Sequence, residues 1–263
     1  MSKVSSVRTV AEEAELRDVL AEIERRKEEA KVQYFIPTEE QEEFFRSKSK
    51  ERFVMGANRS GKSEMGSIEA ISFCLGYRPY LKPSDPDYRT PFEGAVRGLI
   101  TTESFGISGT ANLVIAEKMK QWIPKGALKS EPKKNQQGVP VLFKFKNGSE
   151  LHVMAYEQDT NKYEGSRFHF CWFDENPPQD KFFAVQRGLT DFSGYYWVTA
   201  TPLAEPWTYD GLFLNTSVSK FLLGLNGNTK HLRKWYGFDK LTGGLAEEAV
   251  QNLIRKYRAM HMV

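Results

Sequence analysis

A glycine-rich segment followed by a lysine and a serine is the clearest chemical signal in this sequence. Residues 56–63 fit the spacing G-x-x-x-x-G-K-[ST] at every fixed position. Glycines let successive backbone N–H groups turn toward phosphate oxygens, and the positive N-terminus of a following helix adds to the attraction. The pattern therefore predicts a phosphate-binding loop formed by Gly56, Ala57, Asn58, Arg59, Ser60, Gly61, Lys62 and Ser63.

Two residues of this loop are expected to act through their side chains. The Lys62 ammonium would reach the β- and γ-phosphates of a nucleotide, and the Ser63 hydroxyl would ligate Mg²⁺. The apolar run Phe53-Val54-Met55 precedes the loop, and apolar residues at 65, 68, 71 and 75 follow it at helical spacing up to Gly76. Strand, loop and helix in this order are the setting such a loop requires, so we predict a nucleoside triphosphate and Mg²⁺ as ligands.

An apolar run that ends abruptly in two acids is the second signal. Residues 168–173 read as a buried parallel strand, and Asp174 and Glu175 follow at its carboxyl end, where open α/β sheets bind ligands. Beside a phosphate loop, Asp174 would hold Mg²⁺ through its water shell, and Glu175 would accept a proton from the water that attacks the γ-phosphorus. Alone, the pair also fits an ordinary loop start; with the loop, it favours an NTPase that carries its own base.

A glutamine upstream of the loop has two interpretations. Gln41 lies in an aromatic segment, residues 34–45, in which rings could stack on a purine and a fixed amide could pair with the adenine edge. The pattern Thr38-x-x-Gln41 is also a capping box, which would use the same amide at the start of its own helix. The sequence leaves both open.

The segment Thr199-Ala200-Thr201-Pro202 closes a strand that begins near Tyr195. The hydroxyls of Thr199 and Thr201 could sense the γ-phosphate or its water and couple hydrolysis to the next segment. A plain strand exit ended by proline explains the pattern equally well.

Phosphoryl transfer also calls for an arginine that offsets charge in the transition state. Three candidates lie near the motifs: Arg59, Arg167 and Arg187. Each could act in cis, or in trans from a neighbouring subunit, and the sequence does not choose among them.

Strand-like runs alternate with helical patterns between residues 33 and 204, which predicts a mainly parallel sheet with helices on both faces. One segment breaks this rhythm, because apolar residues alternate on both sides of Asn147-Gly148. That dipeptide between two period-2 runs predicts an antiparallel hairpin added to the α/β body.

The two ends of the chain are expected to lie outside this core. Residues 1–32 carry an amphipathic helix with an apolar stripe of Leu16, Val19, Leu20 and Ile23, interpreted either as a solvated helix lying on the body or as a subunit or partner contact. Residues 205–263 are expected to form a lid and linker that ends in a helical pattern without a stop signal, as if a further domain followed.

Composition narrows the class of protein. The 263 residues are 40% hydrophobic and 27% charged with a net charge of +3, which is ordinary globular composition and compatible with a phosphate-rich partner. Two cysteines without C-x-x-C spacing give neither a disulfide framework nor a cysteine metal site, and no apolar run is long enough to cross a membrane. Secreted and membrane-spanning proteins are therefore excluded, and no membrane partner is expected.

Together these motifs resemble the ATPase half of the large terminase subunit of tailed bacteriophages. The order and spacing of the motifs carry the likeness, not any one of them. They are Pro37…Gln41, the loop at 56–63, the segment 98–122, the Asn147-Gly148-Ser149 turn before Tyr163-Glu164-Gly165, the strand Trp172-Phe173-Asp174-Glu175, Thr199–Pro202 and then Trp207-Thr208-Tyr209-Asp210. The resemblance implies a P-loop NTPase fold of the RecA-like, additional-strand class with a catalytic glutamate. It also implies adenine recognition by Gln41, and it places an arginine loosely at Arg59.

What the resemblance implies for function is an Mg²⁺-dependent ATPase that moves double-stranded DNA into a procapsid, working in the host cell cytoplasm. The implied partners are the DNA, the portal protein, the small terminase subunit and further copies of the chain in a ring of five. The nuclease domain of the family would follow this chain and is not expected within it. Two alternatives remain: a RecA-like domain of a nucleic-acid helicase or translocase, and an assembly module that binds ATP with little turnover.

Overall fold

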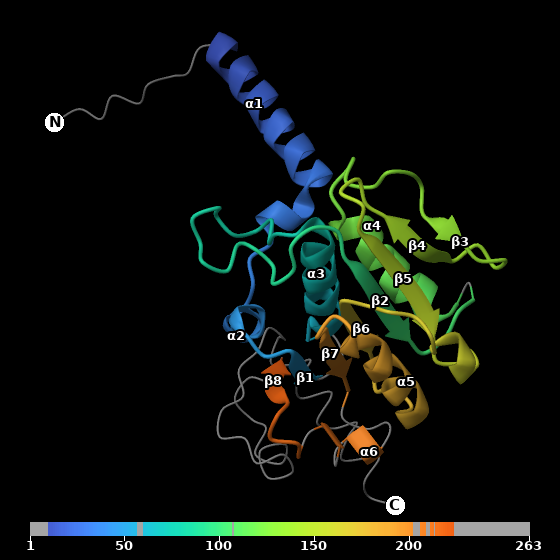
Figure 1. Ribbon diagram of the computed structural model, residues 1–263. Helices are drawn as coiled ribbons and strands as arrows, with labels where there is room; N and C mark the ends of the chain where they lie inside the picture. Colours follow the sequence, from blue (N-terminus) through green and yellow to red (C-terminus); the bar gives the residue numbers. More distant parts are fainter. Residues whose placement is uncertain are drawn as a thin grey trace, which may run out of the picture.

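The computed structural model describes residues 10–56, 60–106, 108–201, 206–208, 211–212 and 214–223. Its centre is an eight-stranded sheet (Figure 1). The strands are β1 (Glu51–Gly56), β2 (Arg97–Thr102), β3 (Lys133–Lys134), β4 (Pro140–Lys144), β5 (Glu150–Ala155), β6 (Phe170–Asp174), β7 (Tyr195–Ala200) and β8 (Ser219–Leu223). The helices are α1 (Val10–Glu29), α2 (Glu39–Arg46), α3 (Lys62–Leu75), α4 (Glu117–Trp122), α5 (Gln179–Thr190) and the short α6 (Pro206–Thr208). There are also two 3₁₀ helices, η1 (Lys31–Tyr34) and η3 (Thr160–Lys162), and a π-helix, η2 (Ala111–Ala116), which leads directly into α4.

The strand order is β3-β4-β5-β2-β6-β7-β1-β8. From β5 to β8 all neighbours pair in parallel, whereas β3, β4 and β5 pair antiparallel. The predicted hairpin is therefore β4 and β5, and its second strand also pairs in parallel with β2. One strand, β7, separates β1 from β6. The expected fold class is confirmed: a mainly parallel sheet with an added hairpin and the additional strand.

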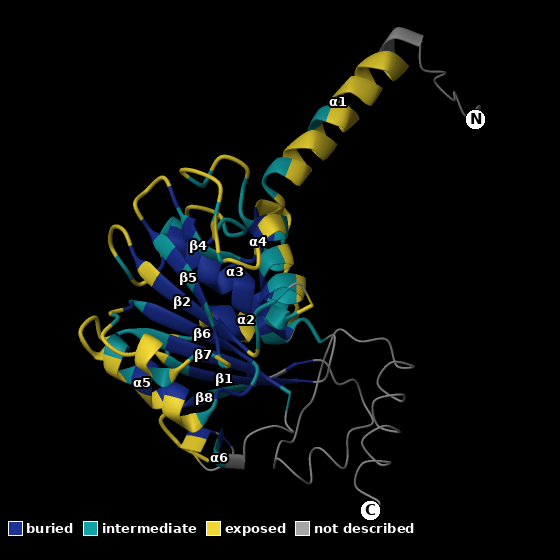
Figure 2. Cartoon of the chain, turned by 90° about the vertical axis from the view of Figure 1, so that its right-hand side faces the viewer, coloured by how far each residue is buried: buried dark blue, intermediate teal, exposed yellow. Residues whose placement is uncertain are grey.

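The sheet is covered on both faces (Figure 2): α3 and α4 pack on one face and α5 on the other. The side chains of β6 point alternately to the two faces of the sheet, so this strand contributes residues to the hydrophobic clusters on both faces. Phe170 and Trp172 join the cluster under α3, while Cys171 and Phe173 join the cluster under α5. All five residues of β6 are buried, as the sequence predicts.

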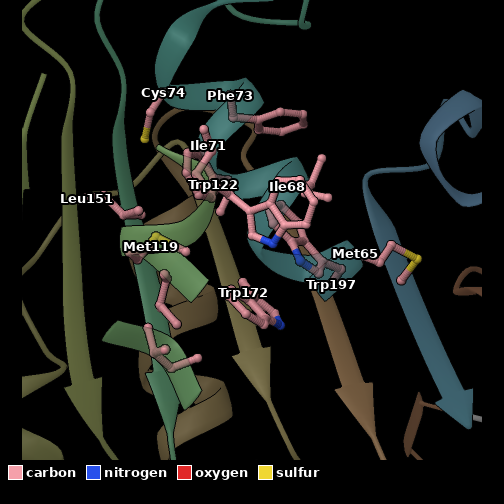
Figure 3. Packing of buried hydrophobic residues seen from close by; sticks show 14 of the residues in the cluster. Met65, Ile68, Ile71, Phe73, Cys74, Met119, Trp122, Leu151, Trp172 and Trp197 are labelled. Carbon is pink, nitrogen blue, oxygen red and sulfur yellow. The ribbon is translucent and has the colours of Figure 1, made fainter. Parts of the chain in front are cut away.

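The helix α3 lies unusually close to the sheet. A Cβ atom added at Gly66 would lie only 2.3 Å from Cε2 of Trp172, so the helix can approach this indole only with glycine at position 66. Figure 3 shows Trp172 and Trp197 gathered with Met65 and Ile68 of α3. The helix ends as predicted at Gly76, which has a φ of 83° in the left-handed region that favours glycine.

The helix α1 extends away from the body and is exposed around most of its surface (Figure 2). Leu16, Val19, Leu20 and Ile23 are between 39% and 50% exposed, so the apolar stripe packs on no part of the described chain. The interpretation of a helix lying on the body is therefore wrong for this structure, and a subunit or partner contact stays a prediction. The sequence also predicts a capping box that begins at Thr9, and this position lies outside the described residues.

The described chain ends with β8, which pairs with β1 and so adds a strand to the sheet from within the segment 205–263. The helical pattern at 246–260 lies outside the described residues. Cys74 and Cys171 are both buried free thiols. Among the described helices, none is long and apolar enough to cross a membrane.

Candidate functional site

The predicted phosphate loop joins the end of β1 to the start of α3. Gly56 is the last residue of β1, and a Cβ atom there would lie 2.6 Å from Oγ of Ser60 and 2.7 Å from the carbonyl oxygen of Leu223. Gly61 has a φ of 87° at the N-cap of α3. Both glycines are thus required by local geometry. Ala57, Asn58 and Arg59, which complete the predicted loop, lie outside the described residues.

The lysine of the loop is buried and folds back onto the loop. Nζ of Lys62 donates a hydrogen bond of 2.9 Å to the carbonyl oxygen of Gly56. Burial lowers the pKa of Lys62, and the nearby carboxylates of Glu175 and Asp174 oppose that shift. The Lys62 side chain therefore lies in a partly desolvated position, where the attraction of its ammonium form to phosphate oxygens is strengthened.

The two residues predicted to hold Mg²⁺ lie in direct contact. The Ser63 hydroxyl donates a hydrogen bond of 2.9 Å to Oδ1 of Asp174, although 111 positions separate them in the sequence. The Thr199 hydroxyl donates to the same oxygen at 3.1 Å. Burial, followed by the charge of Glu175, raises the pKa of Asp174 to about 7, while the two hydroxyl donors act in the opposite direction.

The predicted base follows Asp174 in a left-handed conformation, with a φ of 67°. The backbone N–H of Glu175 donates 2.8 Å to the carbonyl oxygen of Thr199. Its carboxylate accepts hydrogen bonds from the backbone N–H of Thr201 at 2.9 Å and from the Thr201 hydroxyl at 3.3 Å. Each threonine of the predicted coupling segment therefore contacts one of the two acids.

Both interpretations of Gln41 are compatible with its position. The capping box is present, because Thr38 N–H donates 3.0 Å to Oε1 of Gln41 and the Thr38 hydroxyl accepts from the N–H of Gln41. The amide nitrogen points the other way, since a Cβ atom at Gly61 would lie 2.9 Å from Nε2. A carbonyl oxygen has two lone pairs, so Oε1 can serve the cap and still accept from a purine amino group.

The structure does not bring two of the candidate arginines to this site. Arg167 precedes β6, whereas the acids follow it, so Arg167 lies at the opposite edge of the sheet and pairs with Asp191 at 2.8 Å. Arg187 pairs with Glu164 at 2.6 Å. Neither is placed for the role in cis.

Sequence reasoning missed two residues that contact the acid pair and the coupling segment. The Tyr156 hydroxyl donates to the backbone carbonyl oxygens of Glu175 and Asp174, at 3.1 and 3.4 Å. The side-chain amide of Asn176 donates 2.9 Å to the carbonyl oxygen of Thr201. Their position next to strand ends at the same edge of the sheet was the available signal, but neither residue type forms a motif there.

This fold and site define a P-loop NTPase in which an additional strand separates the phosphate-loop strand from the acidic strand. The family model "Terminase large subunit, T4likevirus-type, N-terminal" matches residues 53–219, more than half of the chain. The chain therefore belongs to this family, and it is the ATPase region of a terminase large subunit, the motor that packages bacteriophage DNA. The helicase alternative receives no better support.

Solved structures agree with this assignment at the level of the fold. The large terminase ATPase domain of Thermus phage P74-26 matches with a TM-score of 0.56 and 16% identity, over 79% of this chain and 88% of that one. The large terminase of a second, thermophilic bacteriophage matches with a TM-score of 0.53 and 10% identity, over 87% of this chain but 51% of that one. The chain thus spans about half the length of this second terminase. No curated protein matches the chain.

Proposed function

We propose that this chain hydrolyses ATP in an Mg²⁺-dependent reaction at the edge of the sheet where β1, β6 and β7 end. The observation that carries the proposal is the contact between the Ser63 hydroxyl and Oδ1 of Asp174, because it joins the phosphate loop to the acidic strand. Glu175 follows Asp174 directly in the chain, and it would act as the base beside the γ-phosphate.

The donor set fits Mg²⁺. The ion prefers hard oxygen ligands and takes few from the protein, keeping waters and substrate phosphates in its remaining positions. Ser63 and Asp174 supply one hydroxyl and one buried carboxylate, and the described residues contain no cluster of three or more acidic, histidine or cysteine ligands. The raised pKa of Asp174 fits a carboxylate whose charge would be balanced by a cation. When bound, the ion would neutralise charge on the β- and γ-phosphates.

Residues of the chain would bind the phosphates and the adenine, activate the water and couple hydrolysis to the next segment. Lys62 would leave its bond to the Gly56 carbonyl and bind phosphate oxygens. Glu175 would orient the attacking water and accept its proton, since each of its carboxylate oxygens has a lone pair beyond the one bond it accepts from Thr201. Gln41 would recognise adenine, and Thr199 and Thr201 would transmit the state of the acids to the segment that follows β7.

The partners and surroundings are part of the proposal. Family membership supports DNA and packaging machinery as partners in general. We further propose double-stranded DNA as the translocated substrate and the portal protein, the small terminase subunit and a ring of five copies as the assembly, acting in the host cell cytoplasm. A ring would also allow an arginine to act in trans on the neighbouring site. Arg59 remains the candidate in the phosphate loop itself, in cis or in trans.

The direct test is the ATPase rate of Lys62→Ala and Glu175→Gln. We expect each variant to lower kcat by at least about a hundredfold. Lys62→Ala removes phosphate binding by the lysine, and Glu175→Gln removes activation of the water. Removal of Mg²⁺ with EDTA should abolish turnover in the unmodified chain.

Glu164→Gln is the matched control, since this carboxylate pairs with Arg187 away from the site. Near-normal turnover in both site variants would overturn the proposal, and bound ATP without hydrolysis in the unmodified chain would favour an assembly module.

The dependence of the rate on protein concentration tests assembly. A steep rise in specific activity would indicate that neighbouring subunits complete the site. Arg59→Ala should then lower the plateau rate while leaving the apparent assembly concentration unchanged. A constant specific activity would contradict a contribution in trans.

A further inference from the structure

The backbone at Glu175 is in a conformation that glutamate rarely adopts. Its φ of 67° lies in the left-handed region, where a Cβ atom crowds the following carbonyl group. Among the described non-glycine residues, only Glu175 and Ser193 have a positive φ, and Ser193 lies in the turn after α5. A conformation of this kind persists only where its surroundings hold it in place.

Two backbone contacts hold Glu175. Its N–H is bonded to the Thr199 carbonyl oxygen at 2.8 Å, and its carbonyl oxygen accepts from the Tyr156 hydroxyl at 3.1 Å. The same hydroxyl lies 3.4 Å from the carbonyl oxygen of Asp174, so it spans the peptide that links the two acids. Tyr156 thus contacts the backbone on both sides of the strained torsion.

The tyrosine is itself fixed. Its N–H donates 2.8 Å to the carbonyl oxygen of Thr102, which continues the pairing of β5 with β2. The Thr101 hydroxyl donates 3.3 Å to the Tyr156 hydroxyl, which leaves the tyrosine hydrogen for the two carbonyl oxygens. Burial raises the pKa of Tyr156 well above its ordinary value, so the group stays a donor throughout the physiological range.

We propose that Tyr156 is a positioning residue for ATP hydrolysis: its hydroxyl holds the Asp174–Glu175 peptide so that Glu175 stays in the left-handed conformation that aims its carboxylate. The ring reaches from the end of β5 past Thr101 of β2 to the end of β6. This inference rests on the proposed role of Glu175 as the base. It adds a residue that does not touch nucleotide and acts only through the backbone.

The test compares Tyr156→Phe with Tyr163→Phe. Tyr163 is buried in the hydrophobic cluster under α5, against which Tyr156 also packs. The Tyr163 hydroxyl has no hydrogen-bond partner among the described residues, so Tyr163→Phe controls for the loss of a tyrosine hydroxyl in this region. We expect Tyr156→Phe to lower kcat about tenfold, the equivalent of one hydrogen bond, with KM for ATP and affinity for ADP changed less than about twofold. A merely structural role would not separate kcat from binding in this way. Equal kcat in the two variants would overturn the proposal.

A crystal structure of the Tyr156→Phe variant separates this inference from the proposed function. We expect the φ of residue 175 to leave the left-handed region and its carboxylate to leave Thr201. An unchanged φ near 67° would overturn the positioning role even if kcat falls. If the unmodified chain hydrolyses no ATP, the proposed function fails on that result, and the φ of the variant still decides whether Tyr156 holds this peptide.

Discussion

Two groups of charged side chains contact the same helix, α3. They differ in which residues form hydrogen bonds and ion pairs with their buried acid. At the first turn of α3, Lys62 and Ser63 lie beside Asp174 and Glu175. Two turns further along, Glu69 lies completely buried between two arginines. Asp174 in the first group and Glu69 in the second are both buried, so each acid needs partners to offset the cost of burial.

In the second group, two arginines of the chain itself offset the negative charge of the buried acid. Oε1 of Glu69 accepts from Arg52 at 2.9 Å and from Arg78 at 3.1 Å. Arg52 also donates to the carbonyl oxygen of Phe44 and lies 4.2 Å above the centre of its ring. Arg78 donates to the carbonyl oxygen of Asp87. This group therefore ties α3 to β1, α2 and the loop after the helix.

In the first group, two hydroxyl groups donate hydrogen bonds to the buried acid, and the charge of Lys62 acts on it from nearby. Oδ1 of Asp174 accepts from Ser63 and from Thr199, and the pKa of Asp174 rises to about 7. Glu69, by contrast, accepts hydrogen bonds from two charged guanidinium groups. The comparison indicates that the Glu69 carboxylate offsets two buried arginines of the chain itself, whereas the Asp174 carboxylate can still take the cation proposed to bind there.

The largest expected effect comes from removing the shared carboxylate of the arginine-paired group. Glu69→Gln leaves two buried guanidinium groups without their counter-charge, which should lower the free energy of unfolding by about 3–5 kcal/mol. The measurement is chemical denaturation without nucleotide. KM for ATP of the folded fraction should stay unchanged, since this group lies away from the phosphate loop.

Glu64→Gln is the matched control on the same helix. Glu64 lies 3.7 Å from Lys118 in a partly exposed pair, which is expected to contribute less than about 1 kcal/mol. If the two substitutions destabilise equally, the Glu69 group does not hold the fold together and the contrast between the two groups fails.

A smaller effect is expected from Gly66→Ala, which pushes α3 away from the sheet. The new methyl group would collide with the Trp172 ring, whose indole N–H donates 2.7 Å to the Thr199 hydroxyl beside Asp174. We expect a loss of about 2 kcal/mol of stability from this overpacking, together with a fall in kcat, measured by denaturation and steady-state kinetics. Ser72→Ala on the same helix removes a buried hydroxyl that has no hydrogen-bond partner among the described residues and should be close to neutral. Equal stability of the two variants would contradict the close helix–sheet contact.

The smallest effect separates the two interpretations of Gln41. Thr38→Ala removes the hydroxyl of the capping box and should cost about 1 kcal/mol of stability while leaving KM for ATP unchanged. Gln41→Ala should cost a similar amount and also raise KM about tenfold, the worth of one lost pairing with adenine. Denaturation and steady-state kinetics on both variants give the answer. If neither changes KM, Gln41 only caps its helix.

Local patterns predicted the parts of the fold whose cause is local. The Asn147-Gly148 turn predicted the hairpin because a positive φ is needed there, and Gly148 has a φ of 91°. Gly76 predicted the end of α3 for the same reason. The run that ends in Asp174 and Glu175 predicted a buried strand, and the carboxyl-edge rule predicted that its acids would meet the phosphate loop.

The remaining features depend on contacts that no local pattern records. Tyr156 reaches Glu175 only because β5, β2 and β6 are neighbours in the sheet, and the Glu69 group joins residues from β1, α3 and a loop. The apolar stripe on α1 is a further example of what spacing leaves undetermined. Its spacing predicted an apolar face correctly, but spacing alone cannot tell whether the covering surface belongs to the same chain.

The placement of β7 between β1 and β6 restricts how the motor can move. This strand is paired along both edges, and sliding it by one position would turn every side chain to the opposite face. The strand must therefore stay in register while the nucleotide changes. Any movement coupled to hydrolysis would then begin at Thr201, the first residue beyond the strand, whose N–H donates to the carboxylate of Glu175, the proposed base.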